Sequence, residues 1–317
     1  MIMFRYAHSI VIPVYGNEKN IPDLIPALAR LLEELPGENE VVFVVDGSPD
    51  RSHQLLQEAL EQGPFNARLV SHSRNFGAFA AVRTGCAVAE GEMIGAMAAD
   101  LQEPPELLLQ CFGLLRDDEV DVCFGQRTQR HDGVVRSGLS NLFWGVIRRF
   151  VEPDMPPGGV DIFACNQKVR KALLTIEEHN SSLISQLFWV GFRRRFVPYE
   201  RKERQHGKSA WSFRRRFKYM LDSIFSYSDF PVMALLWIGF IGVLLSIVVS
   251  LVILIAWQMG RITVPGYTPI MLSIFMVGSL QYLAFGILGC YLWRTLENTK
   301  KRPLTIVNNE QEYSQKD

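Results

Sequence analysis

From residue 93 the chain reads Met93-Ile94-Gly95-Ala96-Met97-Ala98-Ala99-Asp100-Leu101-Gln102-Glu103-Pro104-Pro105-Glu106, an apolar run that ends in an acidic corner stopped by two prolines. An apolar run of this length, bounded by Gly91 and by prolines, is typical of a buried strand in a parallel sheet. Open α/β sheets bind ligands just beyond the carboxyl ends of such strands, so we expect Asp100 to belong to a site. The alternative is that Asp100 caps a helix that begins at Pro104.

Strand and helix patterns alternate on both sides of this stretch. Apolar strand patterns occupy residues 9–15, 40–48, 67–71, 121–125, 160–163 and 193–199. Helical spacing of apolar residues follows in 52–62, 78–90 and 137–150, and in a segment that ends near residue 35. Strands that alternate with helices of this length predict an α/β fold with a mostly parallel sheet covered by helices.

The apolar residues of this 317-residue chain, which is 48% hydrophobic, are concentrated near its C-terminus. Residues 231–259 and 269–293 contain no Asp, Glu, Lys or Arg, and each run exceeds the roughly 20 residues that cross a bilayer. They predict a hairpin of two transmembrane helices. The alternative is a pair of buried helices in a soluble protein, although soluble helices of this length ordinarily keep a polar face.

Basic residues flank this hairpin on both sides. The loop 260–268 carries one basic residue, whereas Arg214, Arg215, Arg216 and Lys218 precede the first run and Arg294, Lys300, Lys301 and Arg302 follow the second. The positive-inside rule therefore puts both ends of the hairpin in the cytoplasm. Residues 214–230 mix basic and aromatic side chains, which favours a helix in the membrane interface over an ordinary core helix. The formal net charge of the chain is zero, so acidic residues elsewhere balance this basic belt.

The cysteines and the N-terminal residues argue against a disulfide framework and against a signal peptide. The five cysteines lack the paired spacing of a metal site, and we expect reduced thiols without disulfides. The first residues run into a strand without the apolar core of a signal peptide, so we expect the catalytic part to be cytoplasmic. No nucleic-acid partner is expected.

Two further carboxylates stand beside turns. Asp46 ends a strand in Asp46-Gly47-Ser48, and Asp161 follows a segment rich in Pro and Gly. Asp46 either binds a ligand or only stabilises the turn. Asp161 either takes part in catalysis or only caps its loop.

Taken together, the motifs resemble the family-2 glycosyltransferases of GT-A fold, and within them the polyprenyl-phosphate glycosyltransferases of the bactoprenol glucosyltransferase, aminoarabinose transferase and dolichol-phosphate mannose synthase types. The matching segments, in chain order, are 11–15, 17–18, 45–50, 74–77, 100–106, 160–161, 207–211, 225–231, the two apolar runs and 289–292. The resemblance covers nearly the whole chain.

The resemblance assigns roles around a nucleotide-sugar donor. It implies that Pro13, Tyr15, Glu18 and Asp46 frame the nucleoside. Asn75 lies near the nucleotide beside Arg74, Gly77 lets the backbone pass close to it, and Gln102 lines the same site.

The resemblance also assigns the reacting groups. Asp100 is the implied catalytic metal ligand, which places Mg²⁺ or Mn²⁺ on the donor diphosphate. Asp161 is the implied catalytic residue beside the acceptor, where it orients the lipid phosphate or takes a residual proton. The cationic side chains that gather the phosphates are Arg127, Arg201, Arg204 and Lys208, each of which has the alternative of an ordinary charged surface residue.

Two positions depart from the family pattern. The family shows Asp-Ala-Asp before Leu-Gln, whereas this chain has Ala98 in place of the first Asp, which leaves one carboxylate and puts the strength of metal binding in question. A Lys of the later loop is replaced by Ala210, for which Lys208 can substitute.

The resulting prediction is a multi-pass enzyme of the bacterial cytoplasmic membrane that transfers one sugar from a donor such as UDP-glucose to undecaprenyl phosphate, with inversion. We expect a GT-A domain at 1–213, an interfacial helix at 214–230, the hairpin within 231–296, a cytoplasmic tail at 297–317 and, from the resemblance, a homotetramer. The alternatives are a GDP-mannose-using mannosyltransferase and a degenerate nucleotide-sugar-binding scaffold. A processive polysaccharide synthase is disfavoured because its Gln-x-x-Arg-Trp motif is absent from the sequence.

Overall fold

The computed structural model describes residues 4–128, 153–156, 160–178, 181–202 and 266–316, together with single residues and pairs between 221 and 259. The predicted helix at 137–150, the predicted site residues Arg204 and Lys208, and most of the segments 214–230 and 231–259 therefore lie outside the described residues.

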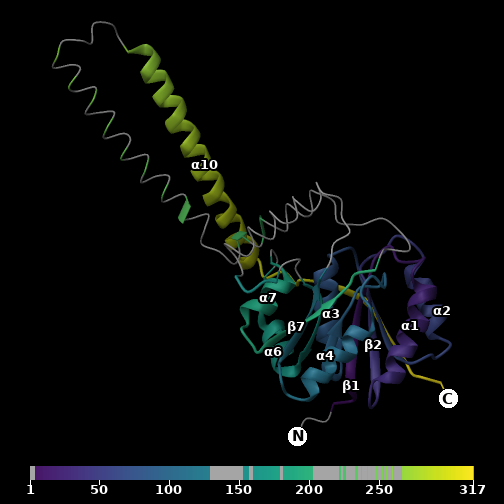
Figure 1. Ribbon diagram of the computed structural model, residues 1–317. Helices are drawn as coiled ribbons and strands as arrows, with labels where there is room; N and C mark the ends of the chain where they lie inside the picture. The colour runs from purple at the N-terminus through teal and green to yellow at the C-terminus, as the bar shows by residue number, and fades with distance from the viewer. Residues whose placement is uncertain are drawn as a thin grey trace.

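An eight-stranded sheet forms the centre of the described chain, in the order β7-β5-β6-β4-β1-β2-β3-β8 (Figure 1). The strands are β1 (Tyr6–Val14), β2 (Asn39–Val45), β3 (Asn66–His72), β4 (Gly91–Ala96), β5 (Val122–Arg127), β6 (Val160–Asn166), β7 (Arg194–Tyr199) and β8 (Val307–Tyr313). β1 pairs in parallel with β2 and β4, as β2 does with β3 and β5 with β7. β6 is antiparallel to β4 and β5, and β8 is antiparallel to β3. The predicted α/β class with a mostly parallel sheet is confirmed.

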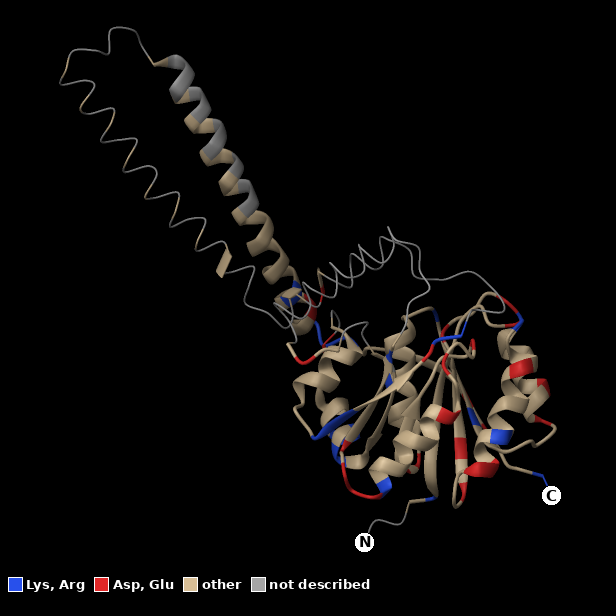
Figure 2. Cartoon of the chain, viewed as in Figure 1, with Lys and Arg blue, Asp and Glu red and all other residues tan. Residues whose placement is uncertain are grey.

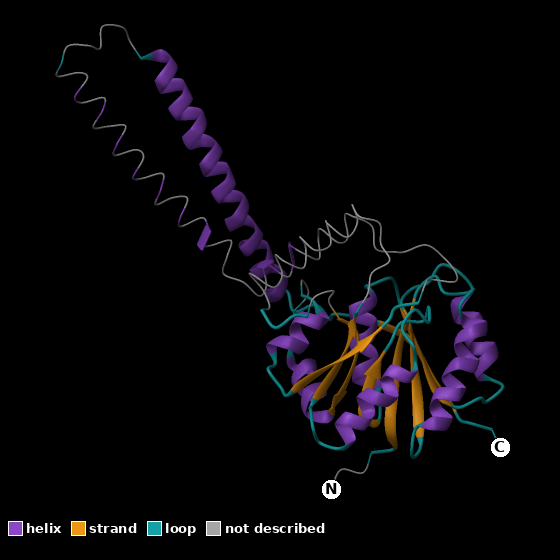
Figure 3. Cartoon of the chain, in the orientation of Figure 1, coloured by secondary structure: helices purple, strands orange, loops and turns teal. Residues whose placement is uncertain are grey.

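Helices cover both faces of this sheet (Figure 3). The helices of the domain are α1 (Ile21–Glu34), α2 (Ser52–Leu60), α3 (Ala78–Val88), α4 (Glu106–Arg116), α6 (Gln167–Thr175) and α7 (Leu183–Trp189). Ile10 and Ile12 of β1 face the core cluster that contains α1, α2 and α4, whereas Val11 faces the cluster that contains α3, α6 and α7. Successive side chains of a strand point to opposite faces, so a strand buried on both sides reads as a continuous apolar run.

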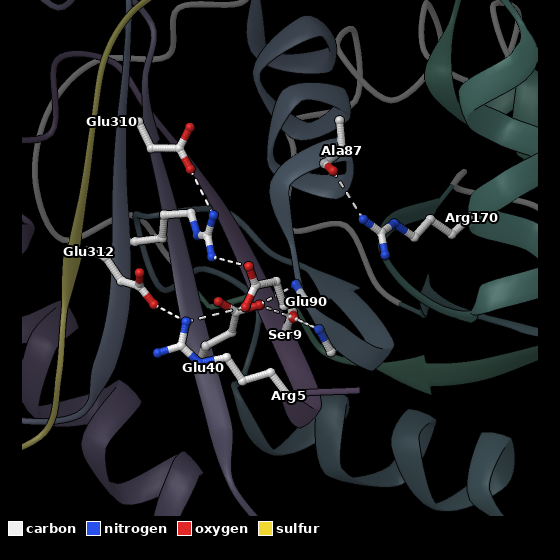
Figure 4. A network of polar contacts seen from close by, with 10 residues as sticks. Arg5, Ser9, Glu40, Ala87, Glu90, Arg170, Glu310 and Glu312 are labelled. Atoms are coloured by element: carbon white, nitrogen blue, oxygen red, sulfur yellow. Dashed lines mark hydrogen bonds and ion pairs between the residues drawn. The ribbon is translucent and has the colours of Figure 1, made fainter. Parts of the chain in front are cut away.

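The strand β8 was not predicted, because its sequence Val-Asn-Asn-Glu-Gln-Glu-Tyr has no apolar alternation. It joins the sheet through its antiparallel pairing with β3, and ion pairs cross the same edge. Arg68 of β3 lies 2.8 Å from both Glu310 of β8 and Glu90, and Arg5 pairs with Glu312 (Figure 4). The segment 297–317 is therefore more than a tail, because its last part is an edge strand of the domain.

Beneath these ion pairs lies a buried carboxyl group, that of Glu40. Its Oε1 accepts hydrogen bonds from Ser9 Oγ at 2.6 Å and from the Glu90 amide at 2.6 Å (Figure 4). Burial raises the pKa of Glu40 above its ordinary value, although both hydrogen bonds oppose the shift. The Gly91 amide in turn donates to Ser9 Oγ at 2.7 Å, so this cluster joins the starts of β1, β2 and β4.

The helix α10 (Tyr267–Thr299) projects away from the layered domain (Figure 1). Within the part of the chain that the structure describes, no helix combines the length and the apolar character that are needed to cross a membrane. Large apolar side chains of α10 are nevertheless exposed, among them Ile270, Ile274, Phe285 and Leu292.

At the foot of α10, charged residues of both signs meet (Figure 2). Arg294 of α10 pairs with Asp222 at 2.8 Å and lies over the ring of Phe225. Tyr291 contacts the same ring, with 5.5 Å between ring centroids. These contacts join the described part of the segment 214–230 to the end of α10.

Two helical glycines provide a matched test of the packing of helices on the sheet. A Cβ atom added to Gly85 of α3 would lie 2.2 Å from Val11 Cγ1, whereas one added to Gly113 of α4 would meet no atom within 4 Å. We expect Gly85→Ala to lower the free energy of unfolding by about 1–3 kcal/mol, because it overpacks the contact of α3 with β1. Gly113→Ala should leave it unchanged or raise it by up to about 1 kcal/mol. Chemical denaturation measures both, and equal effects would contradict this packing.

Candidate active site

The carboxyl ends of the parallel strands β1, β2, β3 and β4 meet at one edge of the sheet. Val14 at the end of β1 pairs with Val45 at the end of β2, which pairs with Ser71 of β3. The Asp46 amide donates to the Val14 carbonyl at 3.0 Å, and the Met97 amide donates to that of Val11 at 3.1 Å. The loops after these strands, which carry most of the predicted site residues, therefore gather at this edge, which we name the donor edge after the role that the resemblance implies for it.

The loop after β1 is fastened to the loop after β2. The Gly16 amide donates to Ser48 Oγ at 2.8 Å, and the Glu18 amide donates to Asp50 Oδ2 at 3.0 Å. The carboxylate of Glu18 accepts from the Arg51 amide at 3.3 Å. The ring of Tyr15 is 41% exposed at this edge. Pro13, the remaining predicted residue of this group, is half-buried near the end of β1.

Asp46 is buried, with only 2% of its surface exposed, and it organises the loop after β3. Its Oδ1 accepts hydrogen bonds from His72 Nδ1 and from the Phe76 amide, both at 2.8 Å, and its Oδ2 accepts from the Gly77 amide at 2.7 Å. Burial alone would raise the pKa of Asp46, but these hydrogen bonds outweigh it and hold the pKa below its ordinary value. Asp46 is therefore an ionised acceptor at neutral pH.

A glycine lets the loops after β2 and β3 touch. Gly47 has φ +59, and a Cβ atom there would lie 2.4 Å from the backbone carbon of Arg74 and 2.6 Å from the amide nitrogen of Asn75. Both the positive φ and this close approach require glycine. The side chain of Asn75 is exposed, and the guanidinium of Arg74 lies over the ring of Phe76. The structure thus brings together Asp46, Asn75 and Gly77.

The corner after β4 is joined to the chain that follows β7. Arg201 Nη2 donates to Gln102 Oε1 at 2.6 Å, and the Lys202 amide donates to the Gln102 carbonyl at 2.9 Å. The guanidinium of Arg201 also lies 3.5 Å from the buried carboxylate of Glu103. Gln102 and Arg201, predicted separately, are therefore direct partners.

Asp100 does not cap the following helix, since the N-cap position of α4 belongs to Pro105. The Gln102 amide lies 3.4 Å from Asp100 Oδ1, and Leu101 between them has φ +52. A positive φ at a residue with a branched side chain is a strained conformation, and such strain is concentrated at functional sites.

The direction of β6 brings Asp161 to the same edge. β6 is antiparallel to β4, with Phe163 opposite Ala96, so its first residues lie at the edge where β4 ends. Val160 pairs with Gln126, which precedes Arg127 at the end of β5. The side chain of Asp161 lies outside the described residues, as do Arg204 and Lys208.

Few of the described side chains could bind a metal ion. Among the described residues, no group of three or more His, Cys, Asp or Glu side chains could hold a metal ion. Mg²⁺ is commonly bound through one or two carboxylates, with the phosphates of the substrate and water as the other ligands. Asp100 fits this mode, whereas Ala98 supplies no oxygen ligand. The five cysteines are free, and four of them are buried.

His72 and Thr84 were missed as site residues. His72 lies inside a strand pattern and Thr84 inside a helix pattern, and nothing in their spacing marks them. Yet His72 Nε2 lies 2.9 Å from Thr84 Oγ1 in addition to the contact of Nδ1 with Asp46.

Asp46→Asn tests the buried carboxylate. The variant turns one acceptor oxygen into an NH₂ donor that faces a backbone amide, and an unsatisfied buried group costs about 1–3 kcal/mol. We expect a loss of that size in the free energy of unfolding at about pH 7. Because the folded-state pKa is depressed, this contribution is complete above the unfolded pKa of about 3.9 and is lost as pH falls through the folded value.

The difference between the wild type and Asp46→Asn should therefore shrink in denaturation experiments below about pH 4. The exposed Asp117→Asn is a matched control and should have little effect. An equal loss at all pH values would contradict an ionised Asp46.

Comparisons with known proteins agree with this architecture. The model of the family described as Glycosyl transferase family 2 matches residues 9–197. An uncharacterised glycosyltransferase of Synechocystis sp. is 32% identical over 301 residues, covering 95% of this chain and 94% of that protein. The bactoprenol glucosyl transferase of Shigella phage SfV is 27% identical, covering 96% of this chain and 99% of that protein. The undecaprenyl-phosphate 4-deoxy-4-formamido-L-arabinose transferase of Edwardsiella ictaluri is 28% identical, covering 95% and 93%. This chain therefore belongs to glycosyl transferase family 2.

Proposed function

We propose that this protein transfers one sugar from a nucleotide-sugar donor to a polyprenyl phosphate by a single inverting displacement. The observation that carries the proposal is the donor edge, where the loops after four parallel strands carry an ionised Asp46 and the Asp100 corner, which Arg201 contacts from the chain after β7, in a family-2 chain. Two relatives that match over nearly the full chain are named for bactoprenol and for undecaprenyl phosphate, which supports a polyprenyl phosphate acceptor.

The nucleoside would lie against the loops after β1, β2 and β3. The exposed ring of Tyr15 offers a face on which a base can stack. An ionised carboxylate has about four lone-pair sites, and Asp46 uses three of them within the protein. Asp46 therefore has one site left for a base N–H or a ribose hydroxyl, and its larger contribution is to hold the loop with Asn75 and Gly77 in place.

The diphosphate would lie between the Asp100 corner and Arg201. The hydrogen bond to Gln102 and the ion pair with Glu103 orient the guanidinium of Arg201, so it can bind a phosphate without losing further side-chain freedom. Asp100 would hold Mg²⁺ or Mn²⁺, which would neutralise charge on the departing nucleoside diphosphate. Arg127 at the end of β5 would add positive charge beside the acceptor.

The acceptor is a phosphate monoester, which is already anionic near neutral pH. One of its oxygens attacks C1 of the sugar while the bond between C1 and the diphosphate oxygen breaks, so the configuration at C1 inverts. Asp161, which β6 brings to this edge, would orient the lipid phosphate or remove its residual proton.

The apolar runs at 231–259 and 269–293 would anchor the domain to the cytoplasmic membrane as a two-helix hairpin. Their lack of charged residues and the exposed apolar side chains of α10 support this anchor. The basic flanks would keep the domain 1–213 on the cytoplasmic side, where nucleotide sugars occur. Two spans bury little surface within the bilayer, which favours association of several copies, and the resemblance implies a homotetramer.

A donor panel tests the reaction. Purified full-length protein is incubated with undecaprenyl phosphate, Mg²⁺ or Mn²⁺ and one radiolabelled nucleotide sugar at a time, including UDP-glucose and GDP-mannose. We expect one donor to give a product that partitions into chloroform and that depends on the lipid. GDP-mannose as the sole donor would identify a mannosyltransferase, and no product from any donor would contradict the proposed function.

Two conservative variants separate the roles of the carboxylates. Asp161→Asn should lower kcat at least about tenfold and leave the donor KM unchanged, because the residue acts on the acceptor. Asp100→Asn should raise the metal concentration needed for half-maximal rate. Both are measured by initial rates across donor and metal concentrations, and equal losses in kcat and donor binding for Asp161→Asn would contradict its role.

A second candidate, a nucleotide-sugar-binding scaffold without turnover, is favoured only by Ala98, which removes one carboxylate from the family pattern. Donor binding in calorimetry without turnover, together with unchanged cellular activity of Asp100→Asn, would support the scaffold.

A further inference from the structure

A chain of side-chain hydrogen bonds, buried from Asp46 to Thr84 and part-buried at Thr305, links the donor edge to the segment after α10. From Asp46 the contacts pass to His72, from His72 Nε2 to Thr84 Oγ1 at 2.9 Å, and from Thr84 Oγ1 to Thr305 Oγ1 at 2.9 Å. The side chain of His72 is 0% exposed and that of Asp46 is 3% exposed. The proposed reaction uses none of His72, Thr84 or Thr305 directly.

Thr305 reaches this position because the segment after α10 returns to the sheet. The Ser73 amide donates to the Ile306 carbonyl at 3.0 Å, and Val307 lies opposite His72 where β8 begins to pair with β3. In Figure 1 this last segment runs from the foot of α10 across the domain to the C-terminus. This segment therefore lies beside β3, the strand that carries His72, at the edge of the sheet.

The protons of this chain have a consistent arrangement. An ionised Asp46 only accepts, so His72 Nδ1 carries a proton. In the neutral imidazole Nε2 then accepts, and the hydroxyl of Thr84 must donate to it. The oxygen of Thr84 is left to accept from the hydroxyl of Thr305. With Nδ1 protonated and the imidazole neutral, Thr305 is thus the first donor in a chain that ends on Asp46.

We propose that Thr305 is a positioning residue for the nucleotide of the donor. Its hydroxyl fixes the hydroxyl of Thr84 and, through it, the imidazole of His72 and the carboxylate of Asp46. Asp46 in turn holds the amides of Phe76 and Gly77, next to Asn75. The inference rests on the proposed function, in which this loop contacts the donor.

Burial makes such a chain effective. In a water-excluded interior each hydrogen bond is stronger than at the surface, and neighbouring bonds polarise one another. The antiparallel pairing of β8 with β3 sets the register of this segment, and the ion pairs of Glu310 with Arg68 and of Glu312 with Arg5 lie along it, so the hydroxyl of Thr305 is presented at a fixed place. Donor binding and docking of the tail are therefore linked.

Kinetics of the full-length protein test this role, with UDP-glucose as donor and undecaprenyl phosphate as acceptor. Thr305→Val should raise the donor KM about threefold to tenfold, since a net hydrogen bond is lost. It should leave kcat and the acceptor KM unchanged, and Thr305→Ser should restore the wild-type donor KM.

The matched control is Thr299→Val, which removes a hydroxyl that donates to the Leu296 carbonyl within α10, and it should change nothing. Glu310→Gln weakens the docking of the tail without removing the Thr305 hydroxyl. A donor KM for Thr305→Val equal to that of the wild type, or equal losses in all three constants, would overturn the proposal.

A second measurement does not depend on turnover. In protein labelled with ¹⁵N-histidine, the imidazole resonances of His72 are assigned by their loss in His72→Gln. We expect these resonances to move in Thr305→Val and to stay in place in Thr299→Val. Unmoved resonances would overturn the hydrogen-bond chain even in an active enzyme. A wild type without turnover of any donor would contradict the proposed function, while the resonances would still decide the role of Thr305.

Discussion

The donor edge depends on one buried carboxylate. Asp46 stands at the end of β2, yet its three hydrogen bonds go to the end of β3 and to the loop that follows β3. Burial of a charge is costly unless hydrogen bonds replace the lost water, and here two backbone amides and an imidazole do so. The same bonds that keep Asp46 ionised determine where Asn75 and Gly77 lie. A buried negative charge at this edge and the position of the loop after β3 therefore both depend on the carboxylate of Asp46.

Two antiparallel strands bring their first residues to the donor edge, which the parallel strands cannot do. A parallel strand brings only its carboxyl end to the donor edge, so a residue at the start of a strand reaches that edge only if the strand runs in reverse. β6 does this for Asp161, and β8 does it for the segment that holds Thr305. The central parallel strands supply the proposed donor site, whereas the reversed strands add the proposed acceptor residue and the hydrogen-bond chain behind Asp46.

How well each strand could be predicted from the sequence depended on how deeply the strand is buried. The strand predicted at 40–48, with Asp-Gly-Ser at its end, is β2 at Asn39–Val45, because a strand buried on both faces reads as a continuous apolar run. β8 is polar and largely exposed, and it pairs with β3, which is distant in sequence, so no local pattern could reveal it. The direction of β6 was hidden for a similar reason, since a strand pattern carries no sign of its orientation.

The site residues show the same division. Asp46, Gln102 and Asp100 follow strands, where the rule for open sheets predicts ligands, and they do lie at one edge of the sheet. His72 and Thr84 could not be predicted, because their importance comes from the atoms that surround them. The partnership of Gln102 with Arg201 likewise joins residues whose separation in the chain gives no hint of contact.

On the proposed function, Ala98 in place of the family's carboxylate would change the electrostatics of the donor edge in two opposing ways. A divalent cation would have one ligand fewer, which would weaken its binding. The diphosphate of a donor, however, meets one negative charge fewer, and like charges held close together repel strongly in a partly buried site. Arg201, oriented by Gln102 and Glu103, supplies positive charge that no metal has to bring. On the proposed function, a site with Asp100 alone therefore depends less on the metal to offset carboxylate repulsion and more on its own guanidinium to hold the diphosphate.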